Sequence, residues 1–332
     1  MSKENGAGSG SGNKKKEINP RLGKVGGQAV LEGVMMKSGE TVAICVRKTG
    51  GALATRKRRV PPLKDKYKWM GVPIVRGVVN FIEMLVLAMS TMTESAEMLE
   101  EGEGAPTEKG KKSSATAAAS VIGAVLGLAL AFVLFFYLPT YITSFIRHHV
   151  VALSWLTSLV EGIIRLLIFL IYIILVSLMR DIRRTFQYHG AEHMSVFCYE
   201  AGEKLVVENA RKYSRFHPRC GTSFIIVMMI VGILISMLIP LSFTYLARLG
   251  VKILLFPFVI GLGFEFIRYA GRHQNRFVRI ISAPGLWMQR LTTKPPDDTM
   301  LEVALVALRD AVGGETDGEE EKNDEIIVTP VD

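Results

Sequence analysis

Two histidines and a glutamate within residues 188–193 are the side chains most suited to metal chemistry. In the stretch Tyr-His-Gly-Ala-Glu-His, His189 and His193 are four residues apart, so on a helix they share one face. Two such imidazoles can bind one divalent ion, with Glu192 beside them. This H-x-x-E-H order is the inverted-zincin arrangement, in which the carboxylate takes a proton from the attacking water. The pattern predicts metal ligands at His189 and His193 and a catalytic base at Glu192.

A site of this kind needs a further ligand from elsewhere in the chain. His217 and Cys220 are three residues apart and offer an imidazole and a thiolate. Glu265 is a third candidate, because a carboxylate near the end of an apolar run is costly unless it has a role. An ion pair with Arg268 explains Glu265 equally well. We expect a divalent metal ion, with zinc as the first choice for ligands of this type.

A closed, structural metal site is the alternative to an open, catalytic one. His189, His193, His217 and Cys220 together would make four tetrahedral ligands. Glu192 would then only orient a histidine from outside the ligand set. The sequence is compatible with both kinds of site.

Composition and patterning indicate the elements that position these residues. Hydrophobic residues make up 49% of the 332 residues and charged residues only 21%, below the quarter or so that is usual in soluble chains. Runs with few or no charges occupy 115–138, 163–179, 222–247 and 249–267, and their lengths suit a bilayer core. We predict a mainly α-helical integral membrane protein with about four transmembrane helices. This excludes a disordered chain and a fully soluble enzyme.

The distribution of basic residues predicts the orientation. Residues 1–70 hold 16 Lys and Arg against 5 Asp and Glu, and residues 180–221 hold another eight Lys and Arg. The positive-inside rule places these segments in the cytoplasm, which predicts a multi-pass cell-membrane protein with N- and C-termini cytoplasmic. The net charge of +9 is then explained by the lipid bilayer and its anionic headgroups, and no nucleic acid is expected.

The remaining segments divide into small units. Residues 21–70 are expected to form a small cytoplasmic β-rich element, a hairpin that turns at Lys37-Ser38-Gly39 and takes Lys204–Glu208 as a third strand. The stretch 71–92 places Arg76, Asn80 and Glu83 on one face, which favours an interfacial or re-entrant helix over a crossing. The further expectations are a disordered tail at 1–20, a linker at 93–114, a transmembrane region at 115–269 with the motif-bearing loop 180–221, cytoplasmic amphipathic helices at 270–312 and an acidic disordered tail at 313–332.

Longer stretches around these motifs resemble a known family. They are Gly26–Met36, the pair Arg76-Gly77, the stretch Tyr188–His193 and the stretch His217–Phe224. Together they are similar to the YqhQ-like family of bacterial membrane proteins, a domain of unknown function that is catalogued as predicted metal-dependent enzymes. The resemblance covers about residues 20–300. It implies a multispanning membrane protein with a metal site, and implies little about the substrate.

Two functional hypotheses follow from the sequence. The first is a metal-dependent hydrolase at the cytoplasmic membrane face, acting on a membrane peptide or a lipid. The second is a non-enzymatic membrane scaffold or assembly factor, with a structural metal or none, that recruits a membrane protein partner. The sequence leaves the oligomeric state open.

Overall fold

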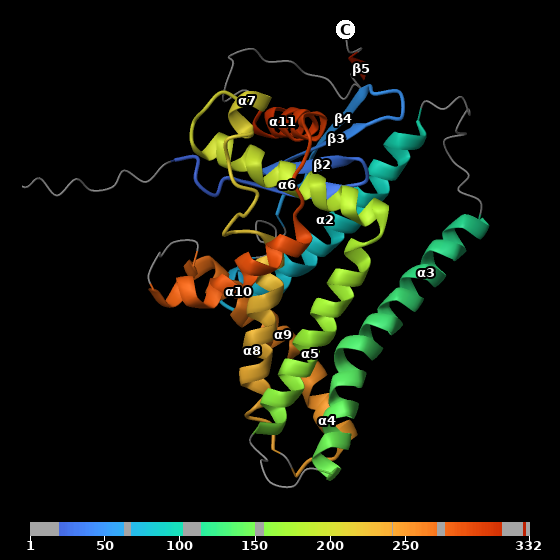
Figure 1. The fold of residues 1–332 in the computed structure, drawn as a ribbon, viewed down its shortest axis with the longest axis vertical. Helices are drawn as coiled ribbons and strands as arrows, with labels where there is room; N and C mark the ends of the chain where they lie inside the picture. The colour runs from blue at the N-terminus through green and yellow to red at the C-terminus, as the bar shows by residue number, and fades with distance from the viewer. Residues whose placement is uncertain are drawn as a thin grey trace, which may run out of the picture.

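The computed structural model describes residues 20–62, 68–101, 114–149, 156–240, 242–270, 276–313 and 328–329. It has a layered sheet-and-helix part at one end and a bundle of long helices at the other (Figure 1). Most of the tails expected at 1–20 and 313–332, and residues 102–113 of the expected linker, lie outside the described residues.

The sheet is larger than the expected hairpin. Its strands follow the chain as an antiparallel series, namely β1 (Val25–Val30), β2 (Gly33–Ser38), β3 (Thr41–Arg47), β4 (Leu53–Arg59) and the short β5 (Val328–Thr329). The hairpin of β2 and β3 is confirmed, with Ser38 paired to Thr41 and Gly39 in the left-handed region at φ 57°. The prediction of a strand at Lys204–Glu208 was wrong. The short helix α7 (Val207–Ala210) begins there, and the hairpin's neighbours are β1 and β4.

Helices cover both faces of the sheet. Helices α6 (Arg180–Glu200) and α11 (Asp298–Val312) pack on one face, and α2 (Val75–Glu100) packs on the other. Alternate residues of β3 supply the two cores, because successive side chains of a strand point to opposite faces. Ala43 and Cys45 join the core under α6 and α11, whereas Val42 and Ile44 join the core that includes Met98 of α2.

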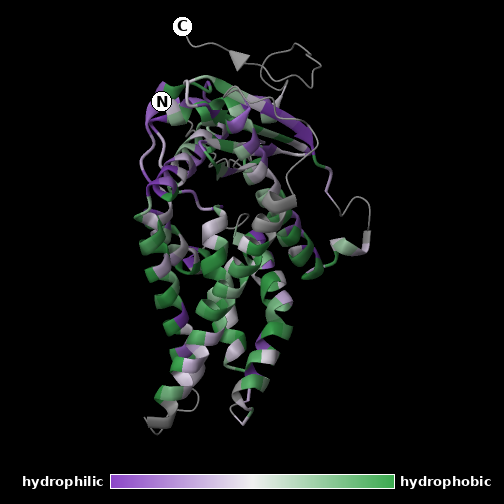
Figure 2. Ribbon diagram, turned by 90° about the vertical axis from the view of Figure 1, so that its right-hand side faces the viewer, coloured by the Kyte–Doolittle hydropathy of each residue, from purple (hydrophilic) through white to green (hydrophobic). Residues whose placement is uncertain are grey.

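The lower part of the molecule is a bundle of apolar helices (Figure 2). Among the described residues, four helical segments are long and apolar enough to cross a membrane: Val75–Glu100, Val125–Ile146, Leu156–Ser177 and Leu246–Ala270. Most of their surface faces outward, since only 11–28% of the most apolar 18-residue stretch of each helix is buried within the protein. Length, composition and exposure together indicate a membrane protein. The helices of this part and its surroundings are α3 (Ser114–Phe132), α4 (Leu138–His149), α5 (Leu156–Ser177), α8 (Gly221–Ser236), α9 (Tyr245–Ala270) and α10 (Arg276–Thr292), with a 3₁₀ turn η1 (Lys68–Gly71) before α2.

The helices differ in extent from the apolar runs of the sequence. The helical segment does not stop before Pro139, since a π-helical turn η2 (Val133–Tyr137) joins α3 to α4 and Pro139 lies in the first turn of α4, where proline is tolerated. Helix α8 has only 16 residues, or about 24 Å, and ends before Pro240. In the connecting segment 180–221, helix α6 carries the histidine motif, which confirms that His189 and His193 lie on a helix.

Helix α2 runs to Glu100, into the segment expected to be a linker, and connects the two parts of the molecule. At its start, Gly77 lies so close to Gly261 of α9 that an added Cβ would come within 2.9 Å of the Gly261 Cα. At its other end, Glu101 accepts hydrogen bonds from Arg56 of β4. Helix α2 therefore begins against a membrane-length helix and ends on the sheet.

We expect Gly33→Ala to destabilise the sheet and Gly26→Ala to leave it unchanged. A Cβ on Gly33 would lie 2.2 Å from the Cys45 carbonyl oxygen, whereas a Cβ on Gly26 meets nothing within 4 Å. Overpacking against backbone costs about 1–3 kcal/mol. Thermal unfolding of the purified protein in detergent should show a lower midpoint for Gly33→Ala alone. Equal midpoints for the two variants would contradict the close strand approach.

Candidate metal centre

Helix α6 presents both motif histidines on one buried face, and the backbone fixes the orientation of their rings. The His189 Nδ1 lies 2.9 Å from the Thr292 carbonyl oxygen, and the His193 Nδ1 lies 2.5 Å from that of Arg215. A carbonyl oxygen only accepts, so each Nδ1 carries the proton and donates it. The Nε2 atoms are then left as unprotonated electron-pair donors. Metal-binding histidines typically have this arrangement, in which the ring nitrogen that does not bind the metal donates a hydrogen bond to the protein.

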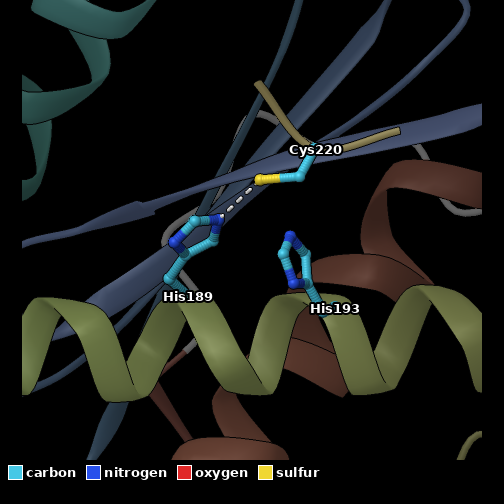
Figure 3. Close-up of side chains that lie close together, drawn as sticks. All are labelled: His189, His193 and Cys220. Atoms are coloured by element: carbon cyan, nitrogen blue, oxygen red, sulfur yellow. Dashed lines mark hydrogen bonds between the residues drawn. The ribbon is translucent and has the colours of Figure 1, made fainter. Parts of the chain in front are cut away.

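Cys220 completes a group of three ligand atoms (Figure 3). Its Sγ lies 3.3 Å from the His189 Nε2, and the ligand atoms of His189, His193 and Cys220 all lie within 4.8 Å of one another. Cys220 is the N-cap of α8, and its sulfur accepts the backbone N–H of Thr222. The partial positive charge of a helix N-terminus therefore faces the sulfur. The structure thus brings a loop residue to the two histidines of α6.

Glu192 lies beside the same group. Its Oε2 is 3.5 Å from the His193 Nε2 and 3.9 Å from the His189 Nε2. Burial raises the pKa of this carboxyl, against the attraction of His189 and His217 and a hydrogen bond from the Gly27 backbone. A Cβ on Gly27 would come within 2.6 Å of the Glu192 Cγ, so only glycine allows β1 to approach so closely.

His217 lies next to the group but has a different partner. Its ring is 5.5 Å from that of His193, while its Nε2 is 3.7 Å from a carboxylate oxygen of Glu200. Burial lowers the pKa of His217. Burial also opposes ionisation of Glu200, but hydrogen bonds from His217, the Gly23 backbone and Arg219 outweigh it and lower the pKa of Glu200. The three-atom ligand group does not include His217, whose Nδ1 lies 3.3 Å from the backbone nitrogen of Arg219 and whose Nε2 lies 3.4 Å from the Arg219 Nη2.

The segment before α8 is held in place by a buried glutamine that sequence reasoning missed. Gln289 of α10 accepts the N–H of His217 at 2.8 Å and donates to the His217 carbonyl and to the Ser223 hydroxyl. Nothing in the sequence around Gln289 marks it. Glu200, in contrast, could have been found, because it follows His189 by 11 residues and so lies on the same face of α6.

Glu265 is bound elsewhere, and the ligand group does not include it. Its carboxylate forms a two-pronged ion pair with Arg76 of α2, with the Nε to Oε1 distance at 2.5 Å. The proposed pair with Arg268 is thus replaced by a pair between α2 and α9.

The stretch Gly26–Met36, one of those that resemble the known family, also contacts α6, because Glu32 accepts a hydrogen bond from the Arg184 Nε at 2.6 Å.

The chemistry of the donor set fits a zinc-type ion. Two imidazole nitrogens and one thiolate are ligands that Zn²⁺ prefers, at about 2.0–2.3 Å from the ion. Two ligands of one ion are then about 3–4 Å apart, so separations of up to 4.8 Å would have to shorten by about 1–2 Å. Three protein ligands and one remaining position are typical of catalytic zinc sites.

Comparison with known proteins identifies the family. A model of the family described as "Protein of unknown function (DUF1385)" matches residues 72–314. The chain belongs to this family. The chain is also 32% identical over 288 residues to the uncharacterized protein YqhQ of Bacillus subtilis (strain 168), an alignment that covers 84% of this chain and 89% of that protein. No solved structure matches the chain. The DUF1385 match includes the three-atom ligand group, whereas strands β1–β4 precede it.

We expect Cys220→Ala to abolish tight metal binding and His217→Ala to retain about one equivalent. The geometry groups the Cys220 sulfur with the two histidines of α6 and leaves His217 outside this group, beside Glu200. Loss of an outer partner weakens metal affinity by about 10–100-fold, which saturating metal overcomes. Elemental analysis after gel filtration would measure this, with thermal unfolding as the check on folding. Loss of metal in folded His217→Ala would indicate the closed four-ligand site.

Proposed function

We propose that this protein is an integral membrane metalloprotein of the cell membrane, with a divalent metal ion, zinc first, bound by His189, His193 and Cys220. We further propose that it is a metal-dependent hydrolase with Glu192 as its general base. The observation that carries the proposal is the orientation of the two histidines, whose Nδ1 atoms donate to backbone carbonyls while the ligand atoms gather around one point with Cys220.

The chemistry divides between the ion and the side chains. When bound, a zinc ion supplies Lewis-acid chemistry at the position that the three ligands leave open. Glu192 is placed to take a proton from an attacking water, because its Oε2 lies within 4 Å of both histidine Nε2 atoms. The His189 side chain is 16% exposed and that of His193 only 2%, so a substrate would approach from the His189 side.

The surroundings favour a substrate that belongs to the membrane. Cys220 caps the N-terminus of the apolar helix α8, and α6 follows α5 after a break of two residues. The site therefore lies where the sheet part meets the membrane-length helices. We propose a membrane peptide or a lipid headgroup as the substrate. The excess of Lys and Arg in 1–70 and 180–221 supports cytoplasmic N- and C-termini and contact with anionic headgroups.

A scaffold with a structural metal is the second candidate. It is favoured by the position of the ligands, because an ion bound by α6 and by the residue that caps α8 would tie the sheet part to the bundle. Structural zinc sites contribute directly to folding. In that case Glu192 would be the fourth ligand or would only orient a histidine.

We expect Glu192→Gln to keep the metal and lose the biological activity. The substitution leaves the three ligands in place but removes a base worth about 10²–10⁴-fold in rate. The measurement is the lipid and membrane-protein profile of cells that lack the protein and are complemented with each variant, together with metal content.

Glu208→Gln is the matched control, since Glu208 is exposed on α7. The hydrolase proposal predicts that Glu208→Gln restores the wild-type profile and that Glu192→Gln leaves the defect of the His189→Ala/His193→Ala double variant. A metal-loaded Glu192→Gln that restores the full profile would favour the scaffold.

A further inference from the structure

A second polar cluster lies inside the helix bundle, at the end opposite the sheet. Its centre is Glu161 of α5, whose side chain is 3% exposed. Glu161 accepts hydrogen bonds from the Thr140 hydroxyl at 2.8 Å, from the Arg165 Nη2 at 3.1 Å and from the Lys252 ammonium group. These groups come from α4, α5 and α9, so the cluster joins three helices. Ionisable side chains buried in a membrane region are costly and usually mark a functional site.

The cluster holds more positive than negative charge. Arg248 is 6% exposed, donates to the Ser158 hydroxyl at 3.3 Å and lines the same small pocket as Glu161. Three cations, Arg165, Arg248 and Lys252, therefore surround one carboxylate, for a net charge of +2. The Nε atoms of Arg165 and Arg248 are buried without a hydrogen-bond partner among the described residues, as is the Oε2 of Glu161. A further anion would satisfy this excess.

An apolar cavity of about 340 Å³ opens beside this cluster. Arg165 and Lys252 are its charged lining residues, and the rest of its wall is largely aliphatic and aromatic. One face of α8 lines it from Ile225 to Ser236, which is about 17 Å at 1.5 Å per residue. The cavity is therefore elongated along the bundle, with its cations near one end. Its volume falls in the range of about 300–1,000 Å³ that is usual for ligand sites. The phenylalanines that line it are Phe81, Phe135, Phe136, Phe169 and Phe256.

We propose that this cavity binds an anionic phospholipid, with an acyl chain along α8 and the phosphate group against Arg165 and Lys252. The apolar wall argues for a hydrocarbon chain, which a free inorganic anion lacks. The unpaired Arg165 Nε argues for a phosphate, because guanidinium groups bind phosphate oxygens through paired N–H donors. The surrounding bilayer would supply such a ligand. This site is separate from the metal centre and does not depend on the proposed function.

The test is native mass spectrometry of the full-length protein in detergent micelles that contain phosphatidylglycerol or phosphatidylcholine. Two variants separate the cavity from the bundle surface. Gly232 lines the cavity, and a Cβ there makes only an ordinary contact of 3.8 Å with Val259, so Gly232→Leu places a side chain in the cavity. Gly127 of α3 has nothing within 4 Å of its Cβ and is exposed on the bundle surface, so Gly127→Leu is the matched control.

The proposal predicts one retained phosphatidylglycerol in the wild type and in Gly127→Leu, bound at least about tenfold more tightly than phosphatidylcholine. Gly232→Leu should lose the bound lipid with unchanged metal content. Arg165→Gln, which keeps the pair of Glu161 and Lys252, should lose the preference for phosphatidylglycerol. Equal retention of the two lipids by the wild type would overturn the preference for a headgroup with net negative charge. Equal retention by Gly232→Leu and Gly127→Leu would overturn the cavity as the site. Complete displacement of the lipid by millimolar inorganic phosphate would overturn the acyl chain as part of the ligand.

Discussion

Helix α6 has a polar face that is buried in the interior, so the surrounding elements have to supply hydrogen-bond partners for its side chains. His193 and Glu192 are 2% and 6% exposed, and an unpaired polar group at such a position would cost several kcal/mol. The carbonyls of Thr292 and Arg215 accept hydrogen bonds from the two histidine Nδ1–H groups, and the Gly27 backbone donates one to Glu192. These partners come from α10, from the segment before α8 and from β1. One buried helix face thus fixes the relative position of elements that are far apart in the sequence.

In the proposed metal site, the same constraint would leave one ligand position open. The segment that delivers Cys220 also delivers His217, but Glu200 and Gln289 hold His217 away from the ligand group. Three protein ligands with a carboxylate alongside are suited to chemistry, while a fourth histidine would have closed the site. The open site and the membrane-length helices that surround it belong together in the proposal of a membrane hydrolase.

The local features of the fold could be predicted from the sequence, and the pairings between distant residues could not. The β2–β3 hairpin follows from alternating residues around a turn, and the proximity of His189 and His193 follows from the helical repeat. The pairing of Glu265 with Arg76 crosses 189 residues, and no periodicity reveals such a contact. The short α8 and the continuation through Pro139 depend on neighbouring helices, which no single apolar run specifies. Glu161 lies two residues before the apolar run that starts at 163, so the sequence gives no sign that its side chain is buried among helices.

X-ray absorption spectroscopy of zinc-loaded protein, purified without chelators, tests the central claim most directly. The account predicts about one equivalent of zinc with two nitrogen ligands at about 2.0–2.1 Å, one sulfur at about 2.3 Å and one further light ligand. A shell without sulfur would exclude Cys220 as a ligand, and a shell of three nitrogens and one sulfur would indicate the closed site with His217. Absence of zinc above background would contradict the account. The buried polar face of α6 would then be a hydrogen-bonded structural element.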